Sequence, residues 1–332
     1  MTAPVLEIYL SDADAAEALR RDARVGLSAE PKWLPPRWLY DARGSELFEQ
    51  ITMLPEYYPT RTERELLRHT VTQIAARAAV DTLVELGSGS SEKTRLLLDA
   101  LTATGSLRRF VPLDVSESAL RAAMAAVARD YPRLAVHGVV GDFTEHLELL
   151  SAAHGGRRLV AFLGGTIGNL VPDERAAFFT ALRAALGLGE LLLLGAGLVT
   201  DPAVMVPAYD DASGVTAEFN RNVLQVLNRE LGADYDVSAF DHIALWDATH
   251  EWIEMRLQAC RAMTVQVPAL GMTVQYAQGE QMRTEVSAKF RRAGLGAELQ
   301  AAGFAEQLWW TDPDDRFALV LAEATGPLRH NI

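Results

Sequence analysis

The chain has 332 residues, of which 49% are hydrophobic and 23% are charged. These proportions are typical of a globular protein with one large domain or two smaller ones. The net charge is −13 and there is no run of Lys or Arg. A nucleic-acid partner is therefore disfavoured, because phosphate binding needs a basic surface. The single cysteine, Cys260, excludes an internal disulfide and fits a reducing compartment.

Neither the N-terminal segment nor the longest apolar run indicates export or membrane insertion. Residues 1–16 have no basic n-region and no apolar core, so we do not expect a signal peptide. The run 191–199 is much shorter than the roughly 20 residues that span a bilayer. We expect a soluble, cytoplasmic protein without a membrane partner.

From residue 82 to residue 200 the sequence alternates strand and helix patterns. The expected strands cover 82–86, 109–113, 135–139, 158–163 and 190–195, and the expected helices cover 92–103, 116–129 and 173–187. The strands are rich in Val and Leu without polar alternation, as in a sheet covered on both faces. Repeated strand–helix units predict parallel strands joined by right-handed crossovers.

After residue 200 the pattern changes. A helix is expected over 213–232, strands of antiparallel type over 250–257 and 263–267, a helix over 287–302, and a closing hairpin over 305–310 and 316–322. The hairpin would lie at the far edge of the parallel sheet. The predicted domains are therefore 62–197 with 287–332, and 1–61 with 198–286. A crevice between two such domains is a natural place for a small ligand.

The end of the first strand of this series carries the strongest local signal. Apolar residues lead to Glu85 and then to the turn Gly87-Ser-Gly89, whose glycines permit a tight bend and leave no Cβ against a ligand. The next strand ends in Asp114, at the position where nucleoside-binding sheets place a carboxylate for ribose hydroxyls. The sequence therefore predicts a nucleoside site at the top of the sheet.

The details of the loop favour S-adenosylmethionine (SAM) over a dinucleotide. The third glycine of the dinucleotide pattern is replaced by Glu92, and that glycine normally allows close packing beneath a pyrophosphate. After the third strand, Asp142 could accept the adenine amino group while Phe143 packs on the base. The terminal hairpin also suits class I SAM-dependent methyltransferases, so we predict their doubly wound α/β sheet with a second α+β domain for the substrate.

Five further segments carry a resemblance to a known family. They are Tyr40-Asp-Ala-Arg-Gly-Ser-Glu-Leu-Phe48, Leu54-Pro-Glu-Tyr-Tyr-Pro-Thr-Arg-Thr-Glu63, Glu85-Leu-Gly-Ser-Gly89, Gly164-Gly-Thr-Ile-Gly-Asn-Leu170 and Arg283-Thr-Glu-Val-Ser287. In this order they resemble the histidine Nα-methyltransferases of ergothioneine biosynthesis. The resemblance implies a monomeric, metal-free enzyme that uses SAM to trimethylate the α-amine of L-histidine, giving hercynine.

The resemblance also implies site residues. For SAM it indicates Tyr57, Gly87, Lys93, Asp114, Asp142, Phe143 and Gly164. For histidine it indicates Asn169 and Tyr209 on the carboxylate, Tyr40 near the amine, Glu285 and Ser287 on the imidazole, and Thr216, Phe219 and Met255 around the pocket, with Tyr57 also in contact. Tyr40 and Asn169 are the candidates for a direct part in catalysis.

The chemistry is compatible with these residue types. Methyl transfer from sulfur to nitrogen is an in-line displacement, so the protein has mainly to align its two ligands. Glu285 and Ser287 are two residues apart and would point the same way in an extended segment, where a carboxylate and a hydroxyl can recognise an imidazole. The alternative is a solvated Glu and a Ser that caps the helix expected from 287. Asn169 could likewise cap the helix that follows it.

Several points stay open at this level. The amine must lose a proton, and Tyr40 or a chain of waters could receive it. Aromatic side chains such as Tyr57 could attract the trimethylammonium product by roughly 1 kcal/mol each. The seven histidines show no ligand spacing, so we expect no metal. The rival functions are a SAM-dependent methyltransferase of another amino acid such as tryptophan, a non-catalytic SAM-binding regulator, and a nicotinamide oxidoreductase.

Overall fold

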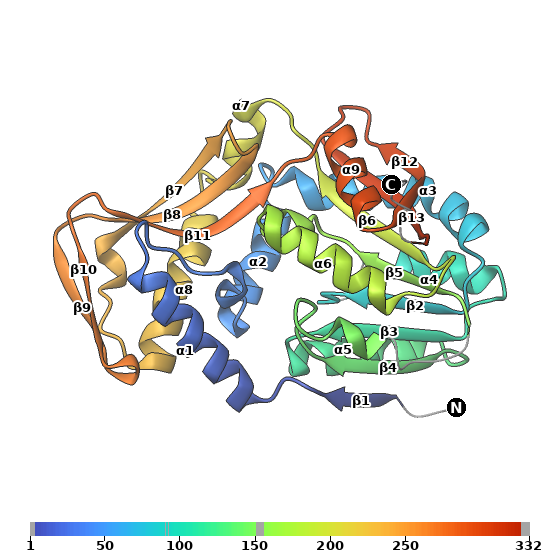
Figure 1. The fold of residues 1–332 in the computed structure, drawn as a ribbon, viewed down its shortest axis with the longest axis horizontal. Coiled ribbons are helices and arrows are strands. Elements are labelled where there is room, and N and C mark those ends of the chain that lie inside the picture. Colours follow the sequence, from blue (N-terminus) through green and yellow to red (C-terminus); the bar gives the residue numbers. More distant parts are fainter. Residues whose placement is uncertain (1–3, 90, 92, 151–155, 327–332) are drawn as a thin grey trace, which may run out of the picture. The chain divides into compact units, whose positions relative to one another are not determined.

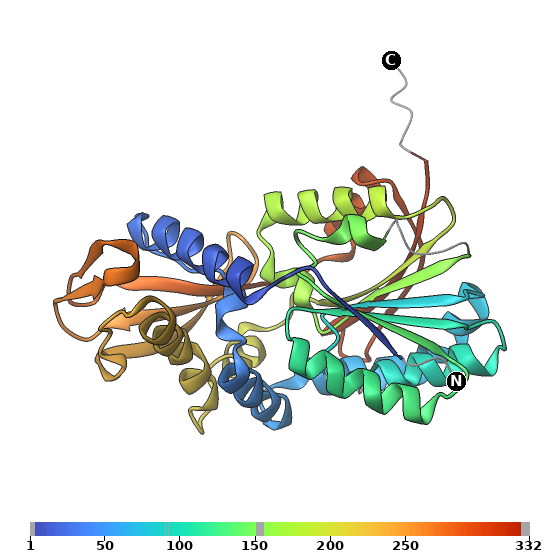
Figure 2. The ribbon, with the colours of Figure 1, turned by 90° about the horizontal axis from the view of Figure 1, so that it is seen from below.

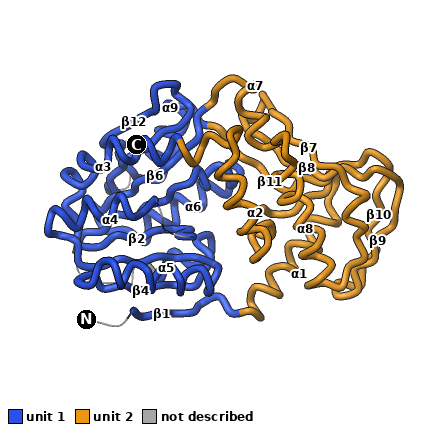
Figure 3. Tube along the Cα trace, turned by 180° about the vertical axis from the view of Figure 1, so that it is seen from behind, with its two compact units in different colours: residues 1–11, 62–198, 290–332 blue, residues 12–61, 199–289 orange. Residues whose placement is uncertain are grey.

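The computed structural model describes residues 4–89, 91, 93–150 and 156–326 (Figure 1). The chain divides into two compact units (Figure 3). The sheet unit comprises 1–11, 62–198 and 290–332, and the second unit comprises 12–61 and 199–289. This division differs from the predicted domains at three places. Residues 1–11 and Leu198 go with the sheet unit, and residues 287–289 go with the second unit.

The sheet unit is built on an eight-stranded sheet within the described residues. Its strands are β1 (Val5–Ile8), β2 (Thr82–Leu86), β3 (Arg109–Asp114), β4 (Ala135–Val140), β5 (Arg158–Phe162), β6 (Leu191–Gly197), β12 (Phe304–Thr311) and β13 (Phe317–Ala324). They lie in the order β1-β4-β3-β2-β5-β6-β13-β12. Strands β1 to β6 are parallel, and β13 runs antiparallel to β6 and to β12. The predicted parallel sheet with a C-terminal antiparallel hairpin at its edge is confirmed.

Helices cover both faces of this sheet (Figure 2). One face carries α3 (Tyr58–Ala78), α4 (Thr94–Ala103) and α5 (Glu117–Asp130), and the other carries α6 (Pro172–Ala185) and α9 (Arg292–Ala301). Local signals explain some of the helix starts: Ser116 Oγ caps α5 by accepting from the Ala119 N–H at 3.3 Å, and Pro172 occupies the first turn of α6. The first residue of the helix predicted over 92–103 lies outside the described residues.

The second unit contains a three-stranded antiparallel sheet, a two-stranded ribbon and several helices. The sheet has the order β11 (Gln281–Ala288), β8 (Trp252–Ala259), β7 (Phe240–Asp247), and the ribbon pairs β9 (Met263–Val267) with β10 (Met272–Tyr276). The helices are α1 (Asp12–Ser28), α2 (Ala42–Met53), α7 (Pro202–Met205) and α8 (Val215–Leu231). Short 3-10 turns are η1 (Pro36–Leu39), η4 (Val206–Ala208), η5 (Val237–Ala239) and η6 (Pro268–Leu270), with η2 (Leu147–Leu150) and η3 (Thr166–Asn169) in the sheet unit.

Two predictions for this part of the chain need correction. The helix expected over 287–302 begins only at Arg292, because residues 281–288 pair with β8. The two predicted strands are present as β8 and β9, but they pair with other strands, which were not predicted from the sequence.

No helix among the residues described combines the length and the apolar character needed to cross a membrane.

Candidate functional site: a nucleoside loop and a buried polar cluster

The turn that follows β2 leaves open space beside its backbone. Gly87 and Gly89 have φ values of +69° and +47°, which favour glycine. Apart from the chain neighbours of each glycine, no atom of the described residues lies within 4 Å of the position that a Cβ would take there. Asp114, at the end of β3, accepts a hydrogen bond from the Gly89 N–H at 2.9 Å and another from the Ser116 N–H at 2.9 Å. The turn and the carboxylate are therefore held together, as the nucleoside prediction requires. This space and this acidic residue fit SAM.

Glu85 braces the same loop from beneath. Its side chain is buried and accepts hydrogen bonds from Ser91 Oγ at 3.0 Å and from Thr94 Oγ1. Burial raises the pKa of Glu85 to about 7, against the opposing effect of these two hydroxyls. Glu85 is therefore a structural acid that ties the loop to α4.

A second connection joins the loop after β2 to the loop after β5. The fully buried carboxylate of Glu63, on α3, pairs with the Lys93 ammonium and also accepts from the Gly164 N–H at 2.7 Å. Strands β2 and β5 are neighbours, and the strand order reverses between them, which is where doubly wound sheets bind ligands. Glu63 therefore fixes two predicted cofactor residues, Lys93 and Gly164, at the switch point.

The residues predicted to bind adenine, Asp142 and Phe143, lie after β4. Asp142 is buried, and its Oδ1 accepts from the N–H and the hydroxyl of Thr144 at 2.8 and 2.6 Å. Phe143 packs edge-to-face on Phe162, with ring centroids 5.0 Å apart, and on Phe178 at 6.0 Å. Both side chains are thus held by the fold, and their contact with adenine remains a prediction.

Asn169 is the last residue of η3, and this short turn begins directly after the Gly164-Gly165 pair. It does not cap α6, whose N-cap is Val171, so the alternative structural explanation is not supported. Within the described residues its amide makes no hydrogen bond. The amide is therefore available to a ligand.

In the second unit, four of the residues predicted to bind the substrate histidine form one aromatic cluster with Phe48: Tyr40, Tyr57, Tyr209 and Phe219. Tyr40 packs on Phe48 and Phe219 with ring centroids 5.4 and 5.2 Å apart, and Tyr57 packs on Phe48 at 6.0 Å and on Tyr209 at 6.1 Å. Burial raises the pKa of Tyr40 and of Tyr57 well above the ordinary value, with smaller contributions from neighbouring Tyr and Glu285 charges. Both phenols are therefore protonated at neutral pH.

Strand β11 and Lys289, the residue that follows it, add a row of buried polar side chains to this cluster. Glu285, Ser287 and Lys289 are 7%, 5% and 6% exposed. Ser287 Oγ lies 2.7 Å from Tyr209 Oη, and Lys289 Nζ donates to both oxygens at 2.9 and 2.8 Å. The predicted extended segment is confirmed, and Ser287 is part of a strand rather than a helix cap.

Glu285 is the acid of this row. It lies opposite Met255 of β8 in the strand register, so two predicted pocket residues are cross-strand neighbours. Its carboxyl makes no hydrogen bond to any of the described residues, and burial raises its pKa to about 8 while the Lys289 charge lowers it. A buried carboxyl in this state needs a partner, and an imidazole N–H can supply one.

The remaining pocket predictions are compatible with this arrangement. Phe219 and Thr216 are buried on α8, and the Thr216 N–H donates to Asp211 Oδ1 at 2.7 Å at the start of that helix. In the part of the chain that the structure describes, no group of His, Cys, Asp and Glu is arranged to hold a metal ion.

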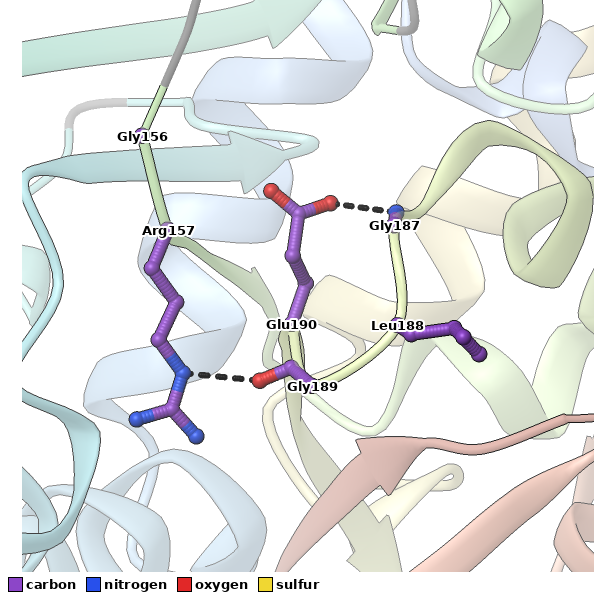
Figure 4. Close-up of a pocket in the computed structure, with 6 residues that line it drawn as sticks. All are labelled: Gly156, Arg157, Gly187, Leu188, Gly189 and Glu190. Carbon is purple, nitrogen blue, oxygen red and sulfur yellow. Dashed lines mark hydrogen bonds between the residues drawn. The ribbon is translucent and has the colours of Figure 1, made fainter.

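A shallow depression of about 400 Å³ lies elsewhere in the sheet unit (Figure 4). Gly156, Arg157, Gly187, Leu188, Gly189 and Glu190 line it, at the amino ends of β5 and β6. Arg157 Nε donates to the Gly189 carbonyl at 2.7 Å, and Glu190 Oε2 accepts from the Gly187 N–H at 2.7 Å. These polar groups serve the loop, and doubly wound sheets bind ligands at the opposite, carboxyl ends of their strands.

Sequence reasoning missed two residues, Glu63 and Lys289. Glu63 is the last residue of the segment 54–63, which carries the family resemblance, but no role was predicted for it. Lys289 lies two residues beyond the segment 283–287. The spacing 285, 287, 289 places three side chains on one face of an extended segment, and that periodicity was the available signal for Lys289. No local pattern marks Glu63, whose partners lie 30 and 101 residues away.

Comparison with known proteins identifies the family. Residues 19–324 match the family of SAM-dependent, histidine-specific methyltransferases. A histidine N-alpha-methyltransferase of Mycolicibacterium smegmatis is 57% identical over 95% of this chain and 97% of its own, and one of Mycobacterium tuberculosis is 57% identical over 92% and 94%. Ergothioneine biosynthesis protein 1 of Neurospora crassa is 28% identical over 92% of this chain but 36% of its own. The chain therefore belongs to the SAM-dependent, histidine-specific methyltransferase family.

Proposed function

We propose that this protein transfers three methyl groups from SAM to the α-amine of L-histidine, which gives hercynine. The observation that carries the choice of substrate is the 57% identity to histidine N-alpha-methyltransferases over nearly the whole chain. The single cysteine supports action in a reducing compartment such as the cytoplasm, and the family resemblance supports a monomer. The product would enter ergothioneine biosynthesis, the process named for the Neurospora relative.

In this proposal the sheet unit holds the methyl donor. Bound there, SAM supplies a methyl group on a positively charged sulfur. Gly87 leaves room for the ligand, Asp114 accepts from the ribose hydroxyls, and Lys93 binds the carboxylate of the methionine part. Asp142 and Phe143 hold the adenine, and Gly164 completes the contacts from this unit. Tyr57, which the family resemblance also indicates for SAM, belongs to the second unit. Glu63 sets the position of the Lys93 ammonium while it also holds the Gly164 backbone.

The second unit recognises histidine through the buried row on β11. Glu285 accepts from one imidazole N–H, and Ser287 binds the other ring nitrogen. Tyr209 binds the carboxylate; Asn169, which the family resemblance also indicates for it, belongs to the sheet unit. Thr216, Phe219 and Met255 shape the pocket. Because a site with buried polar groups leaves them unpaired around an apolar analogue, it discriminates strongly against phenylalanine or leucine.

Deprotonation of the amine precedes attack. Burial keeps the Tyr40 phenol protonated, since its pKa is raised well above the ordinary range. Tyr40 is therefore suited to orient the amine by hydrogen bonding, and a chain of waters is the better route for the proton. The aromatic rings around it, Phe48 and Tyr57 among them, can still attract the product after its last N–H is lost.

The test is incubation of the purified protein with SAM and L-histidine. Mass spectrometry should show successive products with one, two and three added methyl groups, and NMR should place all three on the α-nitrogen. Methylation of an imidazole nitrogen would contradict the proposed alignment. Cofactor binding without any methylated product would instead indicate a regulator.

Substrate choice is tested by calorimetry with histidine, tryptophan and N,N-dimethylhistidine. Tighter binding of tryptophan would overturn the assignment of substrate. Glu285→Gln should weaken histidine binding because it replaces the imidazole's acceptor. The matched variant Glu280→Gln changes an acid of the same unit that pairs with Lys32. It should leave histidine binding within about twofold of the parent, because Glu280 is not among the residues proposed for the substrate.

A further inference from the structure

Lys289 is a buried lysine that none of the roles above explains. It follows β11, and its side chain is 6% exposed although lysines are rarely buried without a partner. Its backbone N–H is fixed by a 2.8 Å hydrogen bond to the Glu251 carbonyl. Burial lowers the pKa of the ammonium, and the charges of Tyr58 and Glu285 act in the opposite direction. The fold therefore places a cation inside the cluster that the proposed function assigns to histidine.

The contacts of this ammonium are specific. Lys289 Nζ donates to Tyr209 Oη at 2.8 Å and to Ser287 Oγ at 2.9 Å, and those two oxygens are 2.7 Å apart. Nζ also lies 4.9 Å from the centroid of the Tyr209 ring. The three polar atoms thus form a closed triangle. It joins one residue assigned to the substrate carboxylate with one assigned to the imidazole.

The three polar atoms have more hydrogen-bond donors than the contacts among them use. An ammonium is a donor only, so both hydroxyl oxygens must accept from it. A single proton can occupy the contact between the two hydroxyls, which leaves the other hydroxyl proton to point away from the triangle. Within the described residues the ammonium makes no third hydrogen bond, so one of its protons is also left. A carboxylate oxygen or an unprotonated ring nitrogen is the kind of acceptor that these two donors require.

We propose that Lys289 is a positioning residue for the amino-acid substrate: its ammonium orients the Tyr209 and Ser287 hydroxyls so that their remaining proton is donated to bound histidine. This inference rests on the proposed function and adds a residue to it. Without the ammonium, both hydroxyls can rotate, and either one can donate to the other. Lys289 therefore couples recognition of the two ends of the substrate.

The test compares Lys289→Met with the matched variant Lys32→Met. Lys32 is also a mostly buried lysine of the second unit, and it lies 5.1 Å from the centroid of the Tyr276 ring and pairs with Glu280. Calorimetry should show that K289M weakens histidine binding about tenfold or more, because two charge-assisted hydrogen bonds are lost. Binding of S-adenosylhomocysteine should be unchanged. K32M should bind both ligands as the parent does.

A mutant cycle separates positioning from a merely structural role. In a protein carrying Tyr209→Phe and Ser287→Ala, Lys289 has no hydroxyl left to orient. K289M should then change kcat/KM for histidine by less than about threefold, because coupled residues are strongly non-additive. A full, independent loss in that background would overturn the inference. Equal histidine binding by K289M and the parent would also overturn it.

Two further measurements keep the result unambiguous. If K289M does not fold by circular dichroism, Lys289→Gln replaces it, since glutamine keeps an amide donor in a shorter side chain; unchanged histidine affinity in K289Q would contradict the inference. If the parent protein itself does not bind histidine, it is the proposed function that fails, and this outcome is distinct from any difference between parent and variant.

Discussion

The Glu63 connection gives the sharpest prediction for the sheet unit. Glu63→Ala removes a carboxylate that is fully buried and that uses both of its oxygens, one for the Lys93 ammonium and one for the Gly164 N–H at 2.7 Å. Both partners lose their acceptor at once. The two loops that it joins follow β2 and β5, at the switch point of the sheet.

The magnitude follows from the two losses. Removing one member of a buried ion pair typically costs about 3–5 kcal/mol. The Lys93 side chain is 23% exposed and can recover some hydration, so we take about 2 kcal/mol for this part. An unsatisfied backbone N–H adds about 1 kcal/mol. We therefore expect the free energy of unfolding to fall by about 3 kcal/mol in E63A.

Urea denaturation at pH 7 measures this change, and calorimetry with S-adenosylhomocysteine measures its effect on the site. The cofactor product should bind more weakly to E63A, because Lys93 and Gly164 are no longer held. Glu65→Ala is the matched control: Glu65 lies two residues along the same helix, on its exposed face, where it pairs with Arg68 and His69. An exposed pair contributes about 0–1 kcal/mol. If E63A unfolds and binds as E65A does, the reasoning is refuted.

Three other predictions concern single residues. Gly195→Ala should destabilise the protein by about 1–3 kcal/mol, because its Cβ would lie 2.2 Å from Glu63 Oε1, whereas Gly294→Ala, in a helix with open space, should raise stability by about 0.5–1 kcal/mol; equal effects in thermal unfolding would contradict this. Burial raises the folded-state pKa of Glu85 to about 7 from an ordinary 4.5, so the stability that it contributes is fully present below pH 4.5 and is lost as pH rises through 7. Relative to Glu85→Gln, the free energy of unfolding of the parent should therefore fall by up to about 3 kcal/mol between pH 4.5 and 8 in urea titrations. If the two proteins show the same dependence of this free energy on pH, Glu85 is not a buried acid with a raised pKa. Tyr57→Leu should slow the third methylation about fivefold relative to Tyr57→Phe, which keeps the ring, and equal time courses by mass spectrometry would remove the aromatic contribution.

The sheet unit could be predicted because its strands are short apolar runs separated by helix patterns and turn glycines. β1 escaped prediction for the opposite reason. It is a four-residue edge strand, and its Val5 and Ile8 are exposed, so no buried pattern marks it. It joins the sheet through parallel pairing with β4, and this pairing of two strands far apart in the sequence cannot be predicted from local sequence patterns.

In the second unit, the buried polar residues of β11 hid the strand pattern from sequence-based prediction. β11 places Thr284, Glu285 and Ser287 in buried positions, so it lacks the apolar alternation that identifies a half-buried strand. The same residues were recognisable by their family motif. Lys289 was not, since its partner Tyr209 lies 80 residues away along the chain. The polar residues proposed for the substrate occupy the positions where a half-buried strand would show apolar residues.

Two lysines, Lys93 and Lys289, suggest why an acidic protein can hold two amino-acid ligands. Histidine and the methionine part of SAM each carry a carboxylate, which the net charge of −13 disfavours at long range. Lys93 lies among the residues proposed for the methyl donor, where Glu63 forms an ion pair with it. Lys289 lies among those proposed for histidine, and its hydrogen bonds there go to neutral hydroxyls. Glu285 also acts on the Lys289 charge, but burial raises the pKa of that carboxyl to about 8, so at neutral pH it offsets the ammonium less than the paired Glu63 carboxylate offsets Lys93. The Lys289 cluster should therefore attract an anionic group more strongly than the Lys93 cluster does. Added salt should therefore weaken histidine binding more than binding of S-adenosylhomocysteine, and calorimetry at two ionic strengths compares them directly.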